Sequence, residues 1–69
     1  MWKNIIAEIG TQRIANDIGM TNTMVWHWAK GNYIPTRKIL PKLKESILKY
    51  APEKYTQFEI SLNKDLIGM

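Results

Sequence analysis

The feature that most restricts the fold of this chain is Gly19, which separates two short apolar patterns within residues 11–30. In each pattern, apolar residues stand three or four positions apart, as on one face of an α-helix. They are Ile14, Ala15 and Ile18 before the glycine, and Val25 and Trp28 after it. Because glycine reaches positive φ without a steric penalty, we expect Gly19 to end the first helix in the left-handed conformation. The pattern predicts two short helices joined by a tight turn.

Threonines at both helix starts support these boundaries. A threonine hydroxyl can accept a backbone N–H that the first turn of a helix leaves free. We therefore expect Thr11 and Thr21 to be N-caps, the second of a helix over residues 22–30, with Met20 buried between the two helices.

The spacing of these residues resembles the helix-turn-helix of the phage Cro and repressor family. The matching positions are Ala15, Gly19, Met20, Val25 and Trp28. The resemblance implies that residues 22–30 form a recognition helix, which such proteins place in the major groove of DNA. An ordinary pair of antiparallel helices with no role in DNA binding is the alternative.

Helices are also expected on either side of this motif. A first, supporting helix is indicated by an apolar stripe that stops at Gly10: Trp2, Ile5, Ile6 and Ile9. A fourth helix is expected over about residues 39–50, on the line of Ile39, Leu43 and Ile47. Because Pro41 lacks a backbone donor, either residues 36–40 form a separate loose turn or this helix is kinked.

The tail, residues 51–69, allows two interpretations. Helical spacing joins Tyr55, Phe58, Leu62 and Leu66, whereas the alternation typical of a strand joins Phe58, Ile60 and Leu62. In the all-helical branch of Cro proteins, a tyrosine, a short turn and a second tyrosine introduce the last helix. The matching positions here are Tyr50, Pro52 and Tyr55. The resemblance therefore favours a helix, which Gly68 would end.

The expected fold is all-α, a single small helix-turn-helix domain of about five helices over residues 1–69. The apolar stripe of the tail lies beyond the three helices that the motif needs. The stripe must therefore cover the core, a partner, or both. We assign it to the contact between two copies of a homodimer: Tyr55, Phe58, Leu62 and Leu66.

Positive charge is concentrated in the middle of the chain. The formal net charge is +4, and residues 21–50 alone carry an excess of +5, while residues 1–20 are balanced and residues 51–69 carry −1. This excess lies in and after the expected recognition helix, where a polyanion would be met. A solvated basic face is the alternative.

Other classes of function find little support in the residues. The chain has no cysteine, and it has no cluster of metal ligands, carboxylate pair or nucleophile–base pair. No apolar run approaches the length of a membrane span. We expect no enzymatic activity, metal, cofactor, small-molecule substrate or membrane, and a cytoplasmic location in a bacterial host cell.

Helix geometry selects the residues that would contact bases. Successive residues turn by about 100°, so the inward positions of Val25 and Trp28 leave an outward face. Its candidate base-reading residues are Asn22, Thr23, Trp26 and His27. Asparagine can pair with adenine, threonine can contact thymine, and histidine can donate to guanine. The Trp26 indole either packs on thymine methyls and sugars or folds back into the core.

The resemblance also implies contacts with the DNA backbone. In this family the start of the second helix lies on phosphates, and so does the chain that leaves the recognition helix at Gly31. The residues assigned to the backbone are Thr11, Gln12, Arg13, Thr21, Lys30, Asn32, Tyr33, Arg37 and Lys38.

These observations predict a sequence-specific regulator of transcription that binds double-stranded DNA. The resemblance implies a phage or prophage repressor of the Cro type that acts as a dimer on a palindromic operator. An activator similar to CII proteins and a protein-interaction module such as an antitoxin are the alternatives.

Overall fold

The computed structural model describes residues 1–67, and within this range every regular element is helical. The elements are α1 (Trp2–Ile9), α2 (Thr11–Ile18), α3 (Asn22–Lys30), α4 (Leu40–Tyr50), the 3-10 turn η1 (Pro52–Lys54) and α5 (Tyr55–Ile67). The predicted all-α fold of five helices is confirmed. The expected helix end at Gly68 lies outside the described residues.

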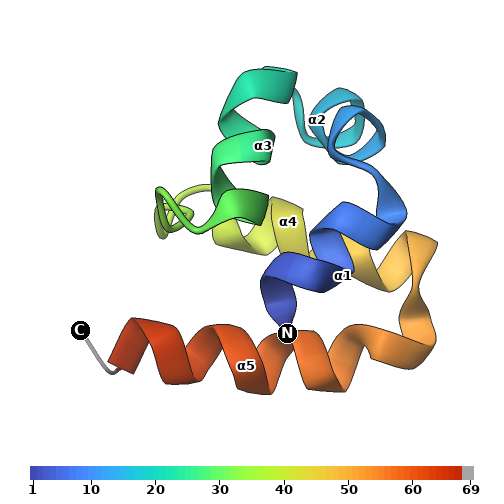
Figure 1. The fold of residues 1–69 in the computed structure, drawn as a ribbon. Coiled ribbons are helices and arrows are strands. Elements are labelled where there is room, and N and C mark those ends of the chain that lie inside the picture. Colours follow the sequence, from blue (N-terminus) through green and yellow to red (C-terminus); the bar gives the residue numbers. More distant parts are fainter. Residues whose placement is uncertain (68–69) are drawn as a thin grey trace.

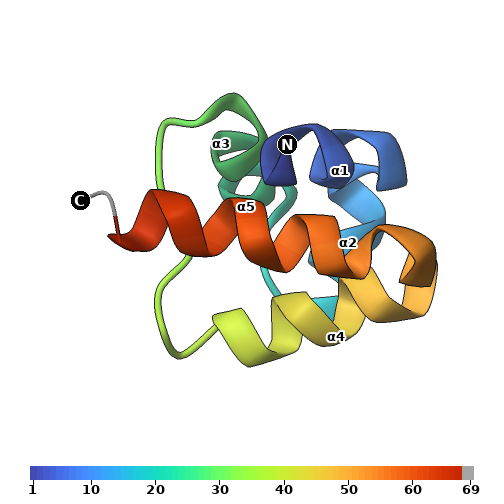
Figure 2. The ribbon, with the colours of Figure 1, turned by 90° about the horizontal axis from the view of Figure 1, so that it is seen from below.

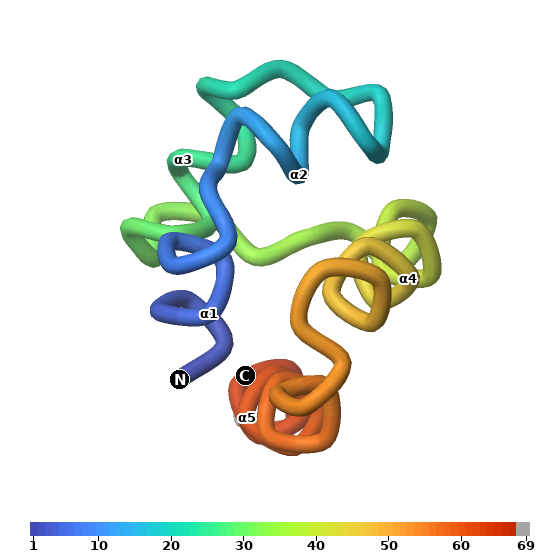
Figure 3. The backbone as a smooth tube through the Cα atoms, turned by 90° about the vertical axis from the view of Figure 1, so that its right-hand side faces the viewer, coloured from blue at the N-terminus to red at the C-terminus, as the bar shows by residue number. Residues whose placement is uncertain are grey.

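The helices are stacked in three tiers. In Figure 1, α2 and the start of α3 lie at one end of the molecule, α1 and α4 lie in the middle, and α5 runs across the other end. Figure 2 shows α5 crossing between α1 and α4, and Figure 3 shows α1 and α4 on opposite sides with α5 next to both. The two helices of the motif therefore lie at the end of the domain that α5 does not cover.

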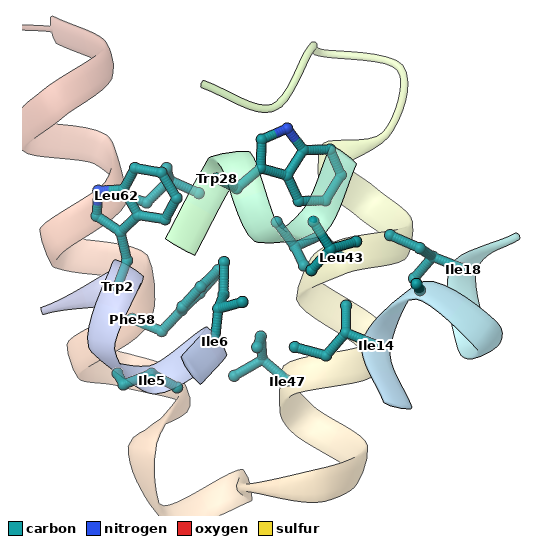
Figure 4. Packing of buried hydrophobic residues seen from close by; sticks show 12 residues of the cluster. Trp2, Ile5, Ile6, Ile14, Ile18, Trp28, Leu43, Ile47, Phe58 and Leu62 are labelled. Carbon is teal, nitrogen blue, oxygen red and sulfur yellow. The ribbon is translucent and has the colours of Figure 1, made fainter. Parts of the chain in front are cut away.

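One apolar core joins all five helices (Figure 4). Its buried members are Trp2, Ile5, Ile6, Ile14, Ala15, Ile18, Val25, Trp28, Leu43, Ile47, Phe58 and Leu62. Each apolar stripe in the sequence supplies part of this list. Removal of apolar surface from water is the main favourable term in the folding of such a domain. The shared core therefore holds α2 and α3 in place against the other helices.

The helix boundaries confirm most of the predicted caps. Gly19 has φ 75° and ends α2 in the left-handed conformation, and the Thr21 hydroxyl accepts the Met24 N–H at 3.2 Å at the start of α3. The prediction for Thr11 is wrong. Gly10 occupies the N-cap position of α2 as well as the C-cap position of α1, so Thr11 is already the first helical residue. Its hydroxyl therefore does not cap a backbone N–H of α2 and can bond to another residue.

The segment before α4 resolves the position of Pro41. Residues 37–39 form a separate turn, in which the N–H groups of Ile39 and Leu40 both donate to the Thr36 carbonyl, at 3.1 and 3.0 Å. The helix begins afterwards, at Leu40, with Pro41 in its first turn. A first-turn proline loses no intrahelical bond, so the separate-turn alternative is the one observed.

The tail is a helix, and its apolar stripe belongs to the core. Phe58 and Leu62 have 0% exposed surface, and Tyr55 and Leu66 are half-buried against the same cluster. The stripe therefore covers the core. For Phe58 and Leu62 the assignment to a dimer contact is corrected, because side chains fully buried within one chain leave no surface for a second copy. A hydrogen bond also joins α5 to α1, since the Trp2 indole N–H donates to Asp65 Oδ2 at 2.5 Å.

Candidate nucleic-acid interface

Helix α3 presents one face to the core and the other to solvent. Val25 and Trp28 are buried, as the spacing predicts, and they hold the helix against the rest of the domain. On the opposite side, Asn22, Thr23, Trp26 and Lys30 are exposed and His27 is half-buried. The Trp26 side chain is 44% exposed, so of the two alternatives for this indole the outward one is observed.

A polar cluster joins the starts of α2 and α3. The Thr11 hydroxyl donates to Asn22 Oδ1 at 2.7 Å. Gln12 Nε2 instead bonds within α2, to Asn16 Oδ1 at 2.8 Å. The first bond occupies one lone pair of the Asn22 amide and leaves the second lone pair and the amide N–H groups. Asn22 is therefore held in place from α2 and retains both an acceptor and donors.

A second cluster surrounds His27 at the end of α3. Asn32 Nδ2 lies 3.0 Å from His27 Nδ1, and the Tyr33 ring packs edge-on at 4.9 Å between centroids. On the other side, the Trp26 ring lies 5.2 Å from the imidazole, and Lys30 Nζ lies 5.6 Å from the Trp26 centroid. The sequence grouped Asn32 and Tyr33 with backbone contacts, but the structure turns both side chains back to His27.

Arg13 is separated from the other residues assigned to the backbone. Its guanidinium lies 5.5 Å from the Tyr50 ring, at the end of α4. Neighbouring positions in a helix point in directions about 100° apart, and Gln12 and Arg13 contact different residues. Of the three assigned residues at the start of α2, only Thr11 contacts Asn22, while Gln12 bonds to Asn16 and Arg13 lies against Tyr50.

Ion pairs divide the basic residues into two groups. Lys44, Lys49 and Lys54 pair with Glu59 (3.8 Å), Asp17 (2.9 Å) and Glu8 respectively. Among residues 1–67, four exposed cations of the middle segment form no such pair: Lys30, Arg37, Lys38 and Lys42. The unpaired charge therefore follows the end of α3 and the start of α4. Lys42 belongs to this group although the sequence analysis did not assign it a contact.

The Asp17–Lys49 pair ties α2 to α4. The hydrogen bond from Lys49 is the main reason why the pKa of Asp17 lies below its ordinary value of 3.8. The same bond raises the pKa of Lys49 above 10.5. Both groups are thus charged near neutral pH, and this lysine is already engaged within the domain.

The described part of the chain lacks the features of two other classes of site. Residues 1–67 contain no group of three or more histidine, cysteine, aspartate or glutamate residues placed to hold a metal ion. Nor does any helix in this range combine the length and the apolar character that crossing a membrane requires.

Comparison of the chain with models of protein families, with curated proteins and with solved structures finds no match.

Proposed function

We propose that this protein binds double-stranded DNA sequence-specifically and represses transcription. The observation that supports the proposal best is the two-sided character of α3. Its inner face is fixed to the core through Val25 and Trp28, while hydrogen-bonding side chains cover its outer face. A helix of this kind, preceded by α2 and a left-handed glycine, has the geometry of a recognition helix.

The chemistry of the outer face suits the edges of base pairs. Asn22 at the start of α3 can form two hydrogen bonds with adenine, and Thr23 offers a hydroxyl and a methyl group for contact with thymine. His27 lies one turn further along and can donate to an acceptor on a purine. The exposed Trp26 offers apolar surface for thymine methyls and sugars.

Phosphate contacts would flank these residues. The first N–H groups of α2 carry the positive end of its dipole, next to Thr11 and Gln12. At the other end of the recognition helix, Lys30, Arg37 and Lys38 carry charge that no carboxylate of residues 1–67 neutralises. Cations of this kind hold a protein on DNA without reading its sequence.

Repression by occupancy needs only this binding surface. We propose that a dimer lies on a palindromic operator in the cytoplasm of a bacterial host and excludes polymerase or a competing protein. The α5 end of the molecule lies opposite α2 (Figure 1), so a second copy placed there would leave the proposed DNA-binding face open.

Selection of bound sites from a random duplex library tests the proposal. We expect enrichment of a two-fold symmetric site. Asn22→Ala should reduce the discrimination between bases at one base pair of each half-site by about 1–3 kcal/mol. Non-specific binding should stay intact. Asn63, exposed on α5, provides the control Asn63→Ala, which should leave the whole profile unchanged. Binding that enriches no sequence contradicts the proposal. Transcription measured with and without the protein then separates repression from activation.

A further inference from the structure

The turn that ends α3 brings Asn32 against His27. Gly31 has φ 82°, its N–H donates to the Trp28 carbonyl at 3.1 Å, and the Asn32 N–H donates to the His27 carbonyl at 2.9 Å. These two bonds make a Schellman motif, in which the residue after the glycine commonly contacts a side chain of the last helical turn. That contact is usually apolar. Here it is a hydrogen bond between an amide and an imidazole.

This contact is compatible with one tautomer of the neutral imidazole. Asn32 Nδ2 lies 3.0 Å from His27 Nδ1. Because an amide nitrogen only donates, Nδ1 must accept through its lone pair. The proton of the neutral ring is then on Nε2, at the opposite edge of the imidazole.

Aromatic neighbours restrict the ring as well. Tyr33 packs at an interplanar angle of 60° on His27, and Trp26 packs at 75°. A ring that is half-buried between two aromatic groups and bonded at Nδ1 has little freedom to rotate. Its Nε2–H is therefore both chemically defined and fixed in direction.

We propose that Asn32 is a positioning residue for base recognition, which holds His27 as an Nε2–H donor. This inference rests on the proposed function, because it assumes that His27 reads a base. In the major groove, guanine N7 and O6, adenine N7 and thymine O4 are acceptors, whereas the amino groups of cytosine and adenine are donors. A histidine locked as a donor selects a base that offers an acceptor and disfavours an amino group at the same place.

The first experiment needs no DNA. His27 is the sole histidine of the chain, so its two ring nitrogens can be assigned without ambiguity in ¹H–¹⁵N correlation spectra. At a pH where the ring is neutral, we expect a protonated Nε2 and an unprotonated Nδ1 in the parent protein. Asn32→Ala keeps the backbone bonds of the turn but should give a mixture of tautomers. Asn32→Asp, whose carboxylate only accepts, should move the proton to Nδ1.

The second experiment compares site-selection profiles of these variants. His27→Ala and Asn32→Ala should both reduce the preference between bases at the same base pair. For Asn32→Ala we expect this preference to fall about fivefold or more, the lower end of what a good base contact contributes. Asn32→Asp should weaken the preference for an acceptor at that base pair. Asn63→Ala on α5 is the control and should change neither the spectrum nor the profile.

The outcomes separate the inference from the function that it rests on. A parent spectrum with the proton on Nδ1, or with mixed tautomers, overturns the inference alone. The same is true if Asn32→Ala weakens binding to all sequences equally, since Asn32 would then be a phosphate contact. A parent protein that binds no duplex DNA contradicts the proposed function, and the reading role of His27 with it, whatever tautomer the spectrum shows.

Discussion

Two tryptophans on α3, two residues apart, experience opposite environments. Trp28 is 2% exposed within the core, whereas Trp26 is 44% exposed on the outer face. The difference follows from helix geometry, since positions two apart lie on different sides. The same residue type therefore serves packing at one position and is available for contact at the other.

Replacement of each tryptophan by alanine should separate these roles. Trp28→Ala leaves a large cavity in the core, and we expect a loss of about 3–5 kcal/mol in the free energy of unfolding. Domains of this size hold only about 5–15 kcal/mol in total, so the variant should be largely unfolded or marginally stable. Denaturant unfolding followed by circular dichroism measures the loss.

Trp26→Ala is the matched control for that measurement. Because its side chain is half-exposed, its removal should change stability by much less than that of Trp28, while it alters DNA binding if the proposed function is right. Equal stability losses for the two variants would show that the environments assigned to them are wrong.

At the scale of elements, the joint between α2 and α3 depends on one backbone conformation. Gly19 has φ 75°, and a Cβ added there would meet no atom within 4 Å. The cost of Gly19→Ala is therefore conformational alone, about 1–2 kcal/mol. Gly19→Asn should lose less, because asparagine tolerates the left-handed region better. Thermal unfolding of the three proteins tests this order, and alanine as stable as glycine would contradict it.

The ion pair between α2 and α4 gives a prediction about pH. Asp17 has a lowered pKa, so its contribution to stability is present above about pH 4 and is lost as the pH falls through the lowered value. Lys49 has a raised pKa, so its contribution is lost only as the pH rises above 10.5. An NMR titration should place the Asp17 pKa below 3.8 in the parent, and Lys49→Met should return it toward 3.8. Lys54→Met, which breaks a different pair, should not change it.

Much of the element arrangement could be predicted from the sequence. Apolar spacing located the first four helices, and Gly19 and Thr21 marked the turn of the motif, because these features depend on residues close together in the chain. For the tail, spacing left helix and strand open, and the resemblance favoured the helix that is observed. The cap at Thr11 could not be predicted, since a glycine followed by a threonine is compatible with either residue at the N-cap. The structure placed Gly10 there.

The site was less predictable than the fold, because its contacts join residues that are further apart in the chain. The outward face of α3 followed from helix geometry, but the contacts that orient it join residues beyond helical spacing. Asn32 is five positions from His27, and Thr11 is eleven positions from Asn22. Lys44 and Lys49 pair with carboxylates on other helices, and a count of charges along the chain cannot predict such pairs.

For the molecule as a whole, the division of the cations into paired and unpaired groups predicts how the affinity for DNA depends on salt concentration. Each phosphate contact contributes about −0.9 to the slope of log K against log salt concentration. Arg37→Ala combined with Lys38→Ala should therefore flatten the slope by up to about 1.8 and weaken all sequences alike. Lys44→Ala combined with Lys54→Ala removes the same formal charge from residues already paired, so its effect should be smaller. Equal slopes for the two double variants would contradict the phosphate assignments.

Burial of the tail stripe changes how the proposed dimer must be tested. Removal of residues 52–69 would take Phe58 and Leu62 out of the core, so such a truncation should unfold the domain instead of only separating two copies. A surface substitution is the cleaner experiment. Ile60 on α5 is 54% exposed and lies in a shallow groove next to Met1 and Lys64.

We expect this outer face of α5 to contact a second copy, since it lies opposite α2 and leaves α3 accessible (Figure 1). Ile60→Asp places a charge in that contact. Sedimentation should then show a monomer at concentrations where the parent associates, and the footprint on a palindromic site should shrink from two half-sites, about 34 Å apart, to one. Leu48 on α4 is 51% exposed, so Leu48→Asp is a control of matched exposure that should leave both measurements unchanged. A parent protein that stays monomeric and protects a single half-site would contradict the dimer, because a palindromic operator requires the two-fold symmetry of its protein.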